Sequence, residues 1–185
     1  TPQRSIVGEE RQDQQARRLI VGGVERGRGE ADLQAVDDES ARLLILTFFA
    51  DDRPLRGLPG LVDWRLNGRI SKLIRTEFVD GHFREATLRP LDRRLPFAEV
   101  LLIGLGERAD YDAERFETIC RFAFGTVARL GTLDLAMQLP GRIGLDVGLR
   151  EAVRGWQRAL VASFTPAELA ELRICLLDAP EVQRE

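Results

Sequence analysis

Two long apolar runs constrain the fold more than any other feature of this sequence. Residues 41–51 are ARLLILTFFAD and residues 97–106 are FAEVLLIGLG. A strand with one face in water alternates apolar and polar residues, whereas a nearly continuous apolar run is typical of a strand buried on both faces. Each run therefore predicts a central strand of a sheet that is covered on both sides.

The segment between these runs has helical spacing. Residues 60–78, GLVDWRLNGRISKLIRTEF, are expected to form one helix, with Trp64 packed as the helix folds onto the sheet. Gly68 inside this helix predicts a close approach by another backbone, because glycine has no side chain to obstruct it. The apolar face of the helix consists of Val62, Leu66, Ile70, Leu73 and Ile74.

The same alternation continues to the end of the chain. Strands are expected within residues 84–91, 132–140 and 172–178. Asp110 or Asp112 is the expected N-cap of a long helix, and a later helix places Trp156 on its apolar stripe. Thr165 and Glu168 fit a capping box with Pro166 at the first helical position. The long helix has an apolar face of Phe116, Ile119, Cys120, Ala123, Val127 and Leu130.

Strands that alternate with helices indicate an α/β domain with a mostly parallel sheet covered on both faces. Ligands of such folds usually bind beyond the carboxyl ends of the strands. Here those ends carry Asp51 and Asp52 after the first apolar run, and Gly104 and Gly106 at the end of the second. These four residues are the candidate ligand-binding residues of the chain.

Residues 104–109 fit the pattern G-x-G-x-x-A, a variant of the dinucleotide-binding fingerprint. That fingerprint requires a helix that begins at the second glycine and an acidic residue at the end of the next strand. Here the residues ERADY follow Gly106 before the expected helix, and the next strand ends in MQLP with no acid. Gly104 and Gly106 are therefore expected to shape the backbone rather than to bind phosphate.

Few residues could support other chemistry. The pair Asp51-Asp52 could bind a cation or a ribose, or could begin a turn that continues into Arg53-Pro54. His82 is the only histidine and lies in a polar stretch, which predicts an exposed turn residue. One histidine and two distant cysteines do not form a zinc site, and we expect no metal site and no cofactor in this chain.

Composition excludes some classes of partner. The net charge of -3 gives no general attraction to nucleic acid or to an anionic membrane. No apolar run approaches the roughly 18 residues of a membrane-spanning helix. Cys120 and Cys175 lie in apolar segments, as buried, reduced thiols of a cytoplasmic protein do. A cytoplasmic location is therefore expected.

The order of the segments resembles the amino-terminal domain of the leucyl aminopeptidase family. The resemblance rests on an apolar strand, then GLVDWRLNGRISKLI, a polar segment and VLLIGLGERADYDAERF. It implies a three-layer α/β/α, macro-domain-like fold with a mostly parallel mixed sheet. It places the macro-like domain at 31–179. The polar composition of residues 1–30 indicates an N-terminal extension or edge element, and residues 180–185 are expected to form a C-terminal tail.

The resemblance carries no catalytic residue to this chain. In that family a separate carboxy-terminal domain binds two metal ions near a motif similar to Asn-Thr-Asp-Ala-Glu-Gly-Arg, and no such motif occurs here. We expect a non-catalytic domain with an assembly, regulatory or partner-binding role, acting through a protein partner or self-association. One alternative is the N-terminal part of a metal-dependent leucyl aminopeptidase. Another is a macro-like module that binds ADP-ribose or a related nucleotide. A small-molecule ligand is compatible with the pattern but not indicated by it, and nucleic acid ranks last.

Overall fold

The computed structural model describes residues 41–91, 94–141 and 148–177. The expected segments 1–30 and 180–185 lie outside these residues. The described elements alternate between strands and helices. In chain order they are β1 (Leu43–Phe48), α3 (Gly57–Arg65), α4 (Arg69–Arg75), β2 (Ala86–Pro90), β3 (Glu99–Gly104), the short 3₁₀ helix η1 (Arg108–Asp110), α5 (Ala113–Leu130), β4 (Asp134–Met137), α6 (Leu149–Ser163), α7 (Pro166–Glu171) and β5 (Arg173–Leu176).

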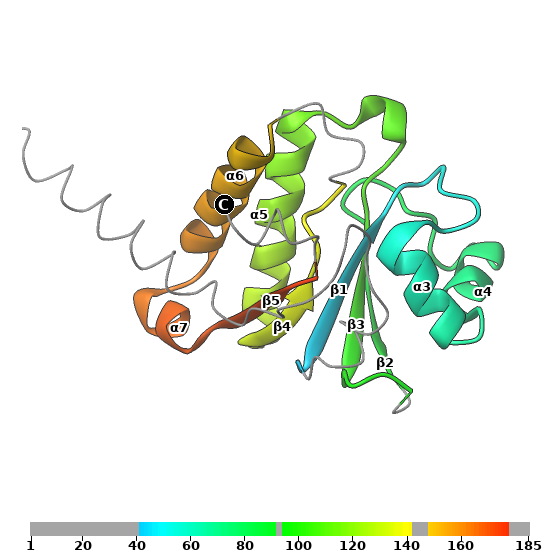
Figure 1. The fold of residues 1–185 in the computed structure, drawn as a ribbon, viewed down its shortest axis with the longest axis horizontal. Coiled ribbons are helices and arrows are strands. Elements are labelled where there is room, and N and C mark those ends of the chain that lie inside the picture. The colour runs from blue at the N-terminus through cyan, green and yellow to red at the C-terminus, as the bar shows by residue number, and fades with distance from the viewer. Residues whose placement is uncertain (1–40, 92–93, 142–147, 178–185) are drawn as a thin grey trace, which may run out of the picture.

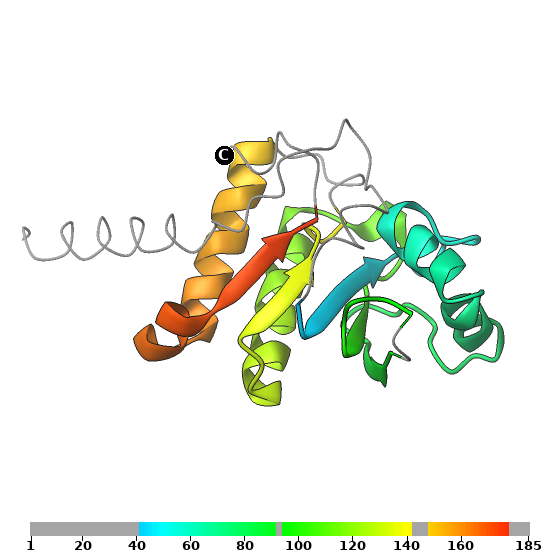
Figure 2. The same cartoon turned by 60° about the horizontal axis from the view of Figure 1, so that its bottom comes forward.

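The strands form one mixed, mostly parallel sheet in the order β2-β3-β1-β4-β5. Strands β3, β1, β4 and β5 run parallel, and β2 pairs antiparallel with β3 at one edge. Figures 1 and 2 show α3 and α4 on one side of this sheet and α5 and α6 on the other. The predicted α/β fold with a mostly parallel, doubly covered sheet is confirmed.

The two apolar runs form the adjacent strands β1 and β3. Alternate residues of each strand face opposite sides of the sheet, and both sides are apolar. Leu43 and Leu101 pack with α5 and α6, whereas Leu44 and Val100 pack with α3 and α4. This arrangement explains why neither strand contains a charged residue between Leu43 and Phe48 or between Val100 and Gly104.

The predicted helix over residues 60–78 is two helices in the structure. The backbone is left-handed at Asn67 and Gly68, with φ values of 55° and 74°, and α4 restarts at Arg69. The expected close approach at Gly68 is wrong, because a Cβ atom there would meet nothing within 4 Å. Gly68 is needed for its positive φ, which glycine adopts without a steric cost.

Two apolar side chains also differ from expectation. Trp64 is 68% exposed instead of packed on the sheet. It lies two positions after the buried Val62, about 200° further around the helix, and so points to solvent. Leu130, the last residue of α5, is 41% exposed.

The other local signals are confirmed. The Asp112 side chain caps α5 by accepting a hydrogen bond from the Arg115 amide at 2.8 Å. Thr165 and Glu168 form the expected capping box. Cys120 and Cys175 are buried free thiols. Trp156 is only 1% exposed and lies edge-on to Phe124, with 5.3 Å between the ring centres.

Candidate functional site

The carboxyl ends of β1 and β3 lie side by side, as the parallel pairing requires. Phe48 and Gly104 are paired residues in the register of the two strands. The loops that follow are joined through the backbone, since the Ala50 amide donates to the Gly106 carbonyl oxygen at 2.9 Å. The structure thus brings the four candidate residues to one edge of the sheet.

Gly104 and Gly106 lie against the segment that precedes β2. A Cβ atom at Gly104 would be 2.1 Å from the carbonyl oxygen of His82, which is far inside van der Waals contact. Gly106 has a φ of 77°, a conformation that favours glycine. The Gly106 amide donates to the Gly81 carbonyl at 2.9 Å, and the Gly104 amide donates to the Glu85 carbonyl at 2.9 Å. Both amides are therefore engaged within the protein.

Asp51 and Asp52 hold an arginine from the neighbouring loop. The Asp52 carboxylate is buried and lies 2.7 Å from the Arg108 guanidinium. The Arg108 amide donates to Asp51 Oδ1 at 3.1 Å, and its guanidinium lies 4.1 Å from the centre of the Phe49 ring. Charge-assisted hydrogen bonds of this kind are among the stronger ones in proteins. The sequence pattern does not single out Arg108, which lies in the ERADY segment between Gly106 and α5.

A carboxylate also organises the segment that packs on Gly104. The Glu85 side chain accepts hydrogen bonds from the amides of Asp80, Gly81 and His82, at distances from 2.6 to 3.2 Å. His82 itself is exposed, as predicted, and its ring lies 3.8 Å from Asp80. Within residues 41–91, 94–141 and 148–177, no group of three His, Cys, Asp or Glu side chains could hold a metal ion.

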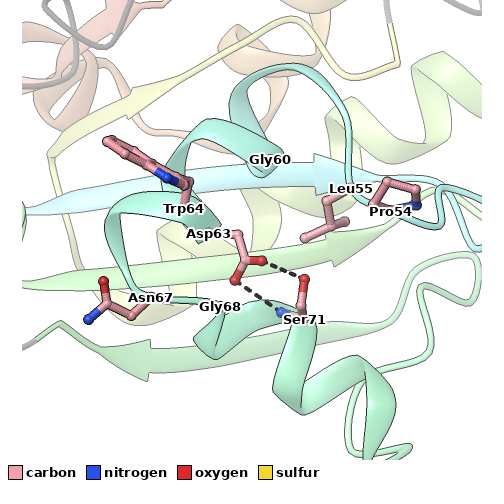
Figure 3. Close-up of a pocket in the computed structure, with 8 residues that line it drawn as sticks. All are labelled: Pro54, Leu55, Gly60, Asp63, Trp64, Asn67, Gly68 and Ser71. Carbon is pink, nitrogen blue, oxygen red and sulfur yellow. Dashed lines mark hydrogen bonds between the residues drawn. The ribbon is translucent and has the colours of Figure 1, made fainter.

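A pocket of about 460 Å³ lies at the junction of α3 and α4 (Figure 3). Its buried carboxylate, Asp63, accepts hydrogen bonds from the Ile70 amide at 2.7 Å and the Ser71 amide at 3.0 Å. The Ser71 hydroxyl donates to the other oxygen of the same carboxylate. Asp63 therefore ties the start of α4 to α3, and Trp64 stands exposed beside it.

Burial also determines the chemistry of two groups near the sheet. Desolvation raises the pKa of the Tyr111 hydroxyl, which donates to the Pro140 carbonyl at 3.0 Å. Desolvation likewise raises the pKa of the Cys120 thiol. A buried thiol with a raised pKa is a poor nucleophile because little thiolate is present. Both side chains are part of the hydrophobic core.

These features define a macro-domain-like α/β protein in which Asp52 and Arg108 form an ion pair at the carboxyl ends of β1 and β3. The family model of the N-terminal domain of the cytosol aminopeptidase family matches residues 45–160. The chain therefore belongs to this family. A search of curated protein sequences gives no match. Among the described residues, no helix is long and apolar enough to cross a membrane.

Solved structures of two kinds share this fold. The macrodomain of Mycobacterium tuberculosis DarG has a TM-score of 0.58 at 11% identity, over 81% of this chain and 93% of that one. A mutant macrodomain of Oceanobacillus iheyensis has a TM-score of 0.58 at 11% identity, over 81% and 84%. A mutant tomato leucine aminopeptidase has a TM-score of 0.53 at 14% identity, over 84% of this chain. This chain spans only 33% of the tomato enzyme. At these identities the likeness shows the fold alone.

Proposed function

We propose that this chain acts as a non-catalytic domain with an assembly, regulatory or partner-binding role, through a protein partner or a second copy of itself. The observation that carries this proposal is the Asp52–Arg108 ion pair at 2.7 Å. The pair lies in the loops at the edge of the sheet where α/β proteins usually bind their ligands. A cytoplasmic location is part of the proposal, supported by two buried free cysteines.

The exposed face of α3 offers a surface for such a partner. Trp64 is 68% exposed beside the pocket that Pro54 and Leu55 help to line. Tryptophan is enriched among the residues that dominate binding energy at protein interfaces. A side chain that contributes little to the fold but exposes a large apolar area is suited to that role.

An activity assay and a measurement of association test this proposal. The purified chain is assayed on a leucyl chromogenic substrate with added manganese or zinc, and we expect no turnover. Metal-dependent turnover that co-elutes with the chain through repurification would overturn the proposal. Sedimentation over a wide concentration range then compares the wild type with Trp64→Ser and with the control Arg121→Glu. Self-association should weaken only in Trp64→Ser.

The family match also supports a second candidate, in which the chain is the N-terminal part of a metal-dependent leucyl aminopeptidase. The match with the tomato enzyme supports this candidate, because this chain corresponds to only 33% of that enzyme. In that case the domain would support a catalytic domain elsewhere in the same protein. The full-length gene sequence distinguishes the two candidates, because it either encodes the metal-binding motif or does not.

Nucleotide binding through the carboxyl edge is the third candidate, and the macrodomain fold is its only support. Calorimetric titration of ADP-ribose, NAD and ATP tests it directly. We expect no heat beyond dilution, because the Gly104 and Gly106 amides already donate within the protein. Micromolar binding that is lost in a folded Gly106→Val protein would instead favour this candidate.

A further inference from the structure

A second pocket, of about 430 Å³, lies between α4 and the edge of the sheet formed by β2 and β3. We define it as the edge groove. The almost fully buried Val100, Leu102 and Ile70 lie at its base, and its accessible apolar floor consists of Leu73, Pro90 and Leu91. In the groove, α4 faces β3 and the edge strand β2 of the order β2-β3-β1-β4-β5. Figure 1 shows α4 and β2 on this side of the molecule.

The rim of the edge groove is positively charged. Arg69 and Lys72 of α4 and Arg89 of β2 line it, and none of the described residues of its lining is a carboxylate. Among the described residues, no acidic side chain forms an ion pair with Lys72 or Arg89. By contrast, Arg108, Arg115, Arg121 and Arg158 all pair with acidic residues. The chain as a whole has a net charge of -3, whereas the charged residues among the described groove lining are all cations.

An aromatic side chain extends the groove at one end. The Arg89 guanidinium lies 4.5 Å from the centre of the Phe78 ring, and Phe78 is 55% exposed. The stacked ring limits the positions that Arg89 can adopt, so its charge is held at the groove. An apolar floor, a cationic rim and an exposed ring suit a ligand that carries both aliphatic or aromatic groups and carboxylates.

From this complementarity we infer that the edge groove binds an acidic amphipathic peptide segment of a partner protein. Leucine, isoleucine, valine or phenylalanine side chains of the segment would enter the groove, and flanking Asp or Glu residues would pair with Lys72 and Arg89. This inference rests on the proposed partner-binding function and specifies the chemistry of the partner. The apolar floor favours a peptide over nucleic acid, whose backbone needs cations rather than aliphatic contacts.

The test begins with selection of random displayed peptides on the immobilised full chain. We expect the enriched peptides to place Asp or Glu next to large apolar residues. A synthetic, fluorescently labelled copy of the most enriched peptide is then titrated with the chain by fluorescence anisotropy. Binding should weaken by about tenfold or more in Lys72→Glu and in Arg89→Glu, because like charges across an interface repel. It should also weaken as salt is added.

The control variant is Arg121→Glu, which reverses a charge on α5, on the opposite side of the sheet. It should bind the peptide as the wild type does, and circular dichroism should show all three variants folded. Enriched peptides without acidic residues, no enriched peptide, or equal binding by wild type and both groove variants would each overturn the inference.

Two further probes distinguish an acidic peptide from other anionic ligands of the edge groove. The chain should bind anionic phosphatidylserine vesicles no more tightly than neutral vesicles, and duplex DNA no more tightly than an uncharged polymer. Tighter binding of the chain to either anionic probe, lost in Lys72→Glu, would overturn the peptide assignment. If no peptide is selected and the chain also shows no aminopeptidase turnover, the proposal that the edge groove binds a peptide is wrong. The assignment of the chain as non-catalytic is then unaffected. Turnover by the purified chain would overturn that assignment separately.

Discussion

The Arg108 guanidinium and the Asp52 carboxylate are 2.7 Å apart, although 56 positions separate them in the sequence. The carboxylate is buried and the arginine is about one third exposed. The pair joins the loop after β1 to the loop after β3. It lies at the carboxyl ends of β1 and β3, and its contribution to stability can be tested independently of any ligand.

Removing one member of this pair should destabilise the domain. In Arg108→Ala the Asp52 carboxylate stays buried without its strongest partner, so we expect a loss of about 1–3 kcal/mol in the free energy of unfolding. Urea denaturation measures it. The control Arg42→Ala breaks a pair with Glu99 at 3.9 Å in which Arg42 is 67% exposed, and such pairs contribute about 0–1 kcal/mol. Equal losses in both variants would contradict a special role for the Asp52 pair.

The two tryptophans should respond in opposite ways to truncation. Trp156 is 1% exposed and Trp64 is 68% exposed. Trp156→Ala should cost about 3–5 kcal/mol, because it removes buried contacts and leaves a cavity. Trp64→Ala should change stability by less than about 0.5 kcal/mol, as exposed substitutions usually do. Chemical denaturation followed by circular dichroism compares the two. An unchanged midpoint in Trp156→Ala would show that the α6 packing described above is wrong.

Alanine substitutions at Gly104 and Gly125 should have opposite effects on stability, because Gly104 lies against another backbone segment and Gly125 lies inside a helix. Gly104→Ala places a Cβ atom 2.1 Å from a backbone oxygen, so the loop before β2 must move, at a cost of at least about 1–3 kcal/mol. Gly125 lies inside α5, and a Cβ atom there would meet only the end of Arg129, at 3.8 Å. Gly125→Ala should therefore stabilise the domain by about 0.5–1 kcal/mol. Thermal denaturation of both variants gives the two signs, and a stable Gly104→Ala protein would contradict the packing of residues 81–82 on Gly104.

The capping box at α7 predicts a pH dependence. Hydrogen bonds from the Thr165 amide and hydroxyl lower the pKa of Glu168, so its folded pKa lies below the ordinary value of about 4.3. The carboxylate therefore contributes stability above that ordinary value, and the contribution is lost as the pH falls through the folded pKa.

Comparison of the wild type with Glu168→Gln isolates this effect. The wild type should be the more stable of the two near neutral pH, and the difference should shrink as the pH falls below about 4.3. Urea denaturation at a series of pH values measures it. A difference that stays constant across this range would show that the Glu168 charge has no part in the cap.

The sequence by itself determined the central strands and several helix ends. The runs that form β1 and β3 lack charged residues between Leu43 and Phe48 and between Val100 and Gly104. Burial on both faces leaves no position for a charge, so composition alone indicates such strands. The Asp112 and Thr165 caps were likewise predictable, because a capping side chain bonds to amides two or three residues away.

Only the tertiary structure showed which distant residues are in contact and where the helix predicted from the apolar pattern is interrupted. The division of the predicted helix at Asn67 and Gly68 depends on Asp63, whose carboxylate accepts from the Ile70 and Ser71 amides across the break. The choice of Arg108 as partner of Asp52 depends on the parallel pairing of β1 with β3. The Asp63 contacts span a turn that the helical periodicity of residues 60–78 does not show. The contact of Asp52 with Arg108 is set by the order of strands in the sheet, and local spacing carries no information about that order.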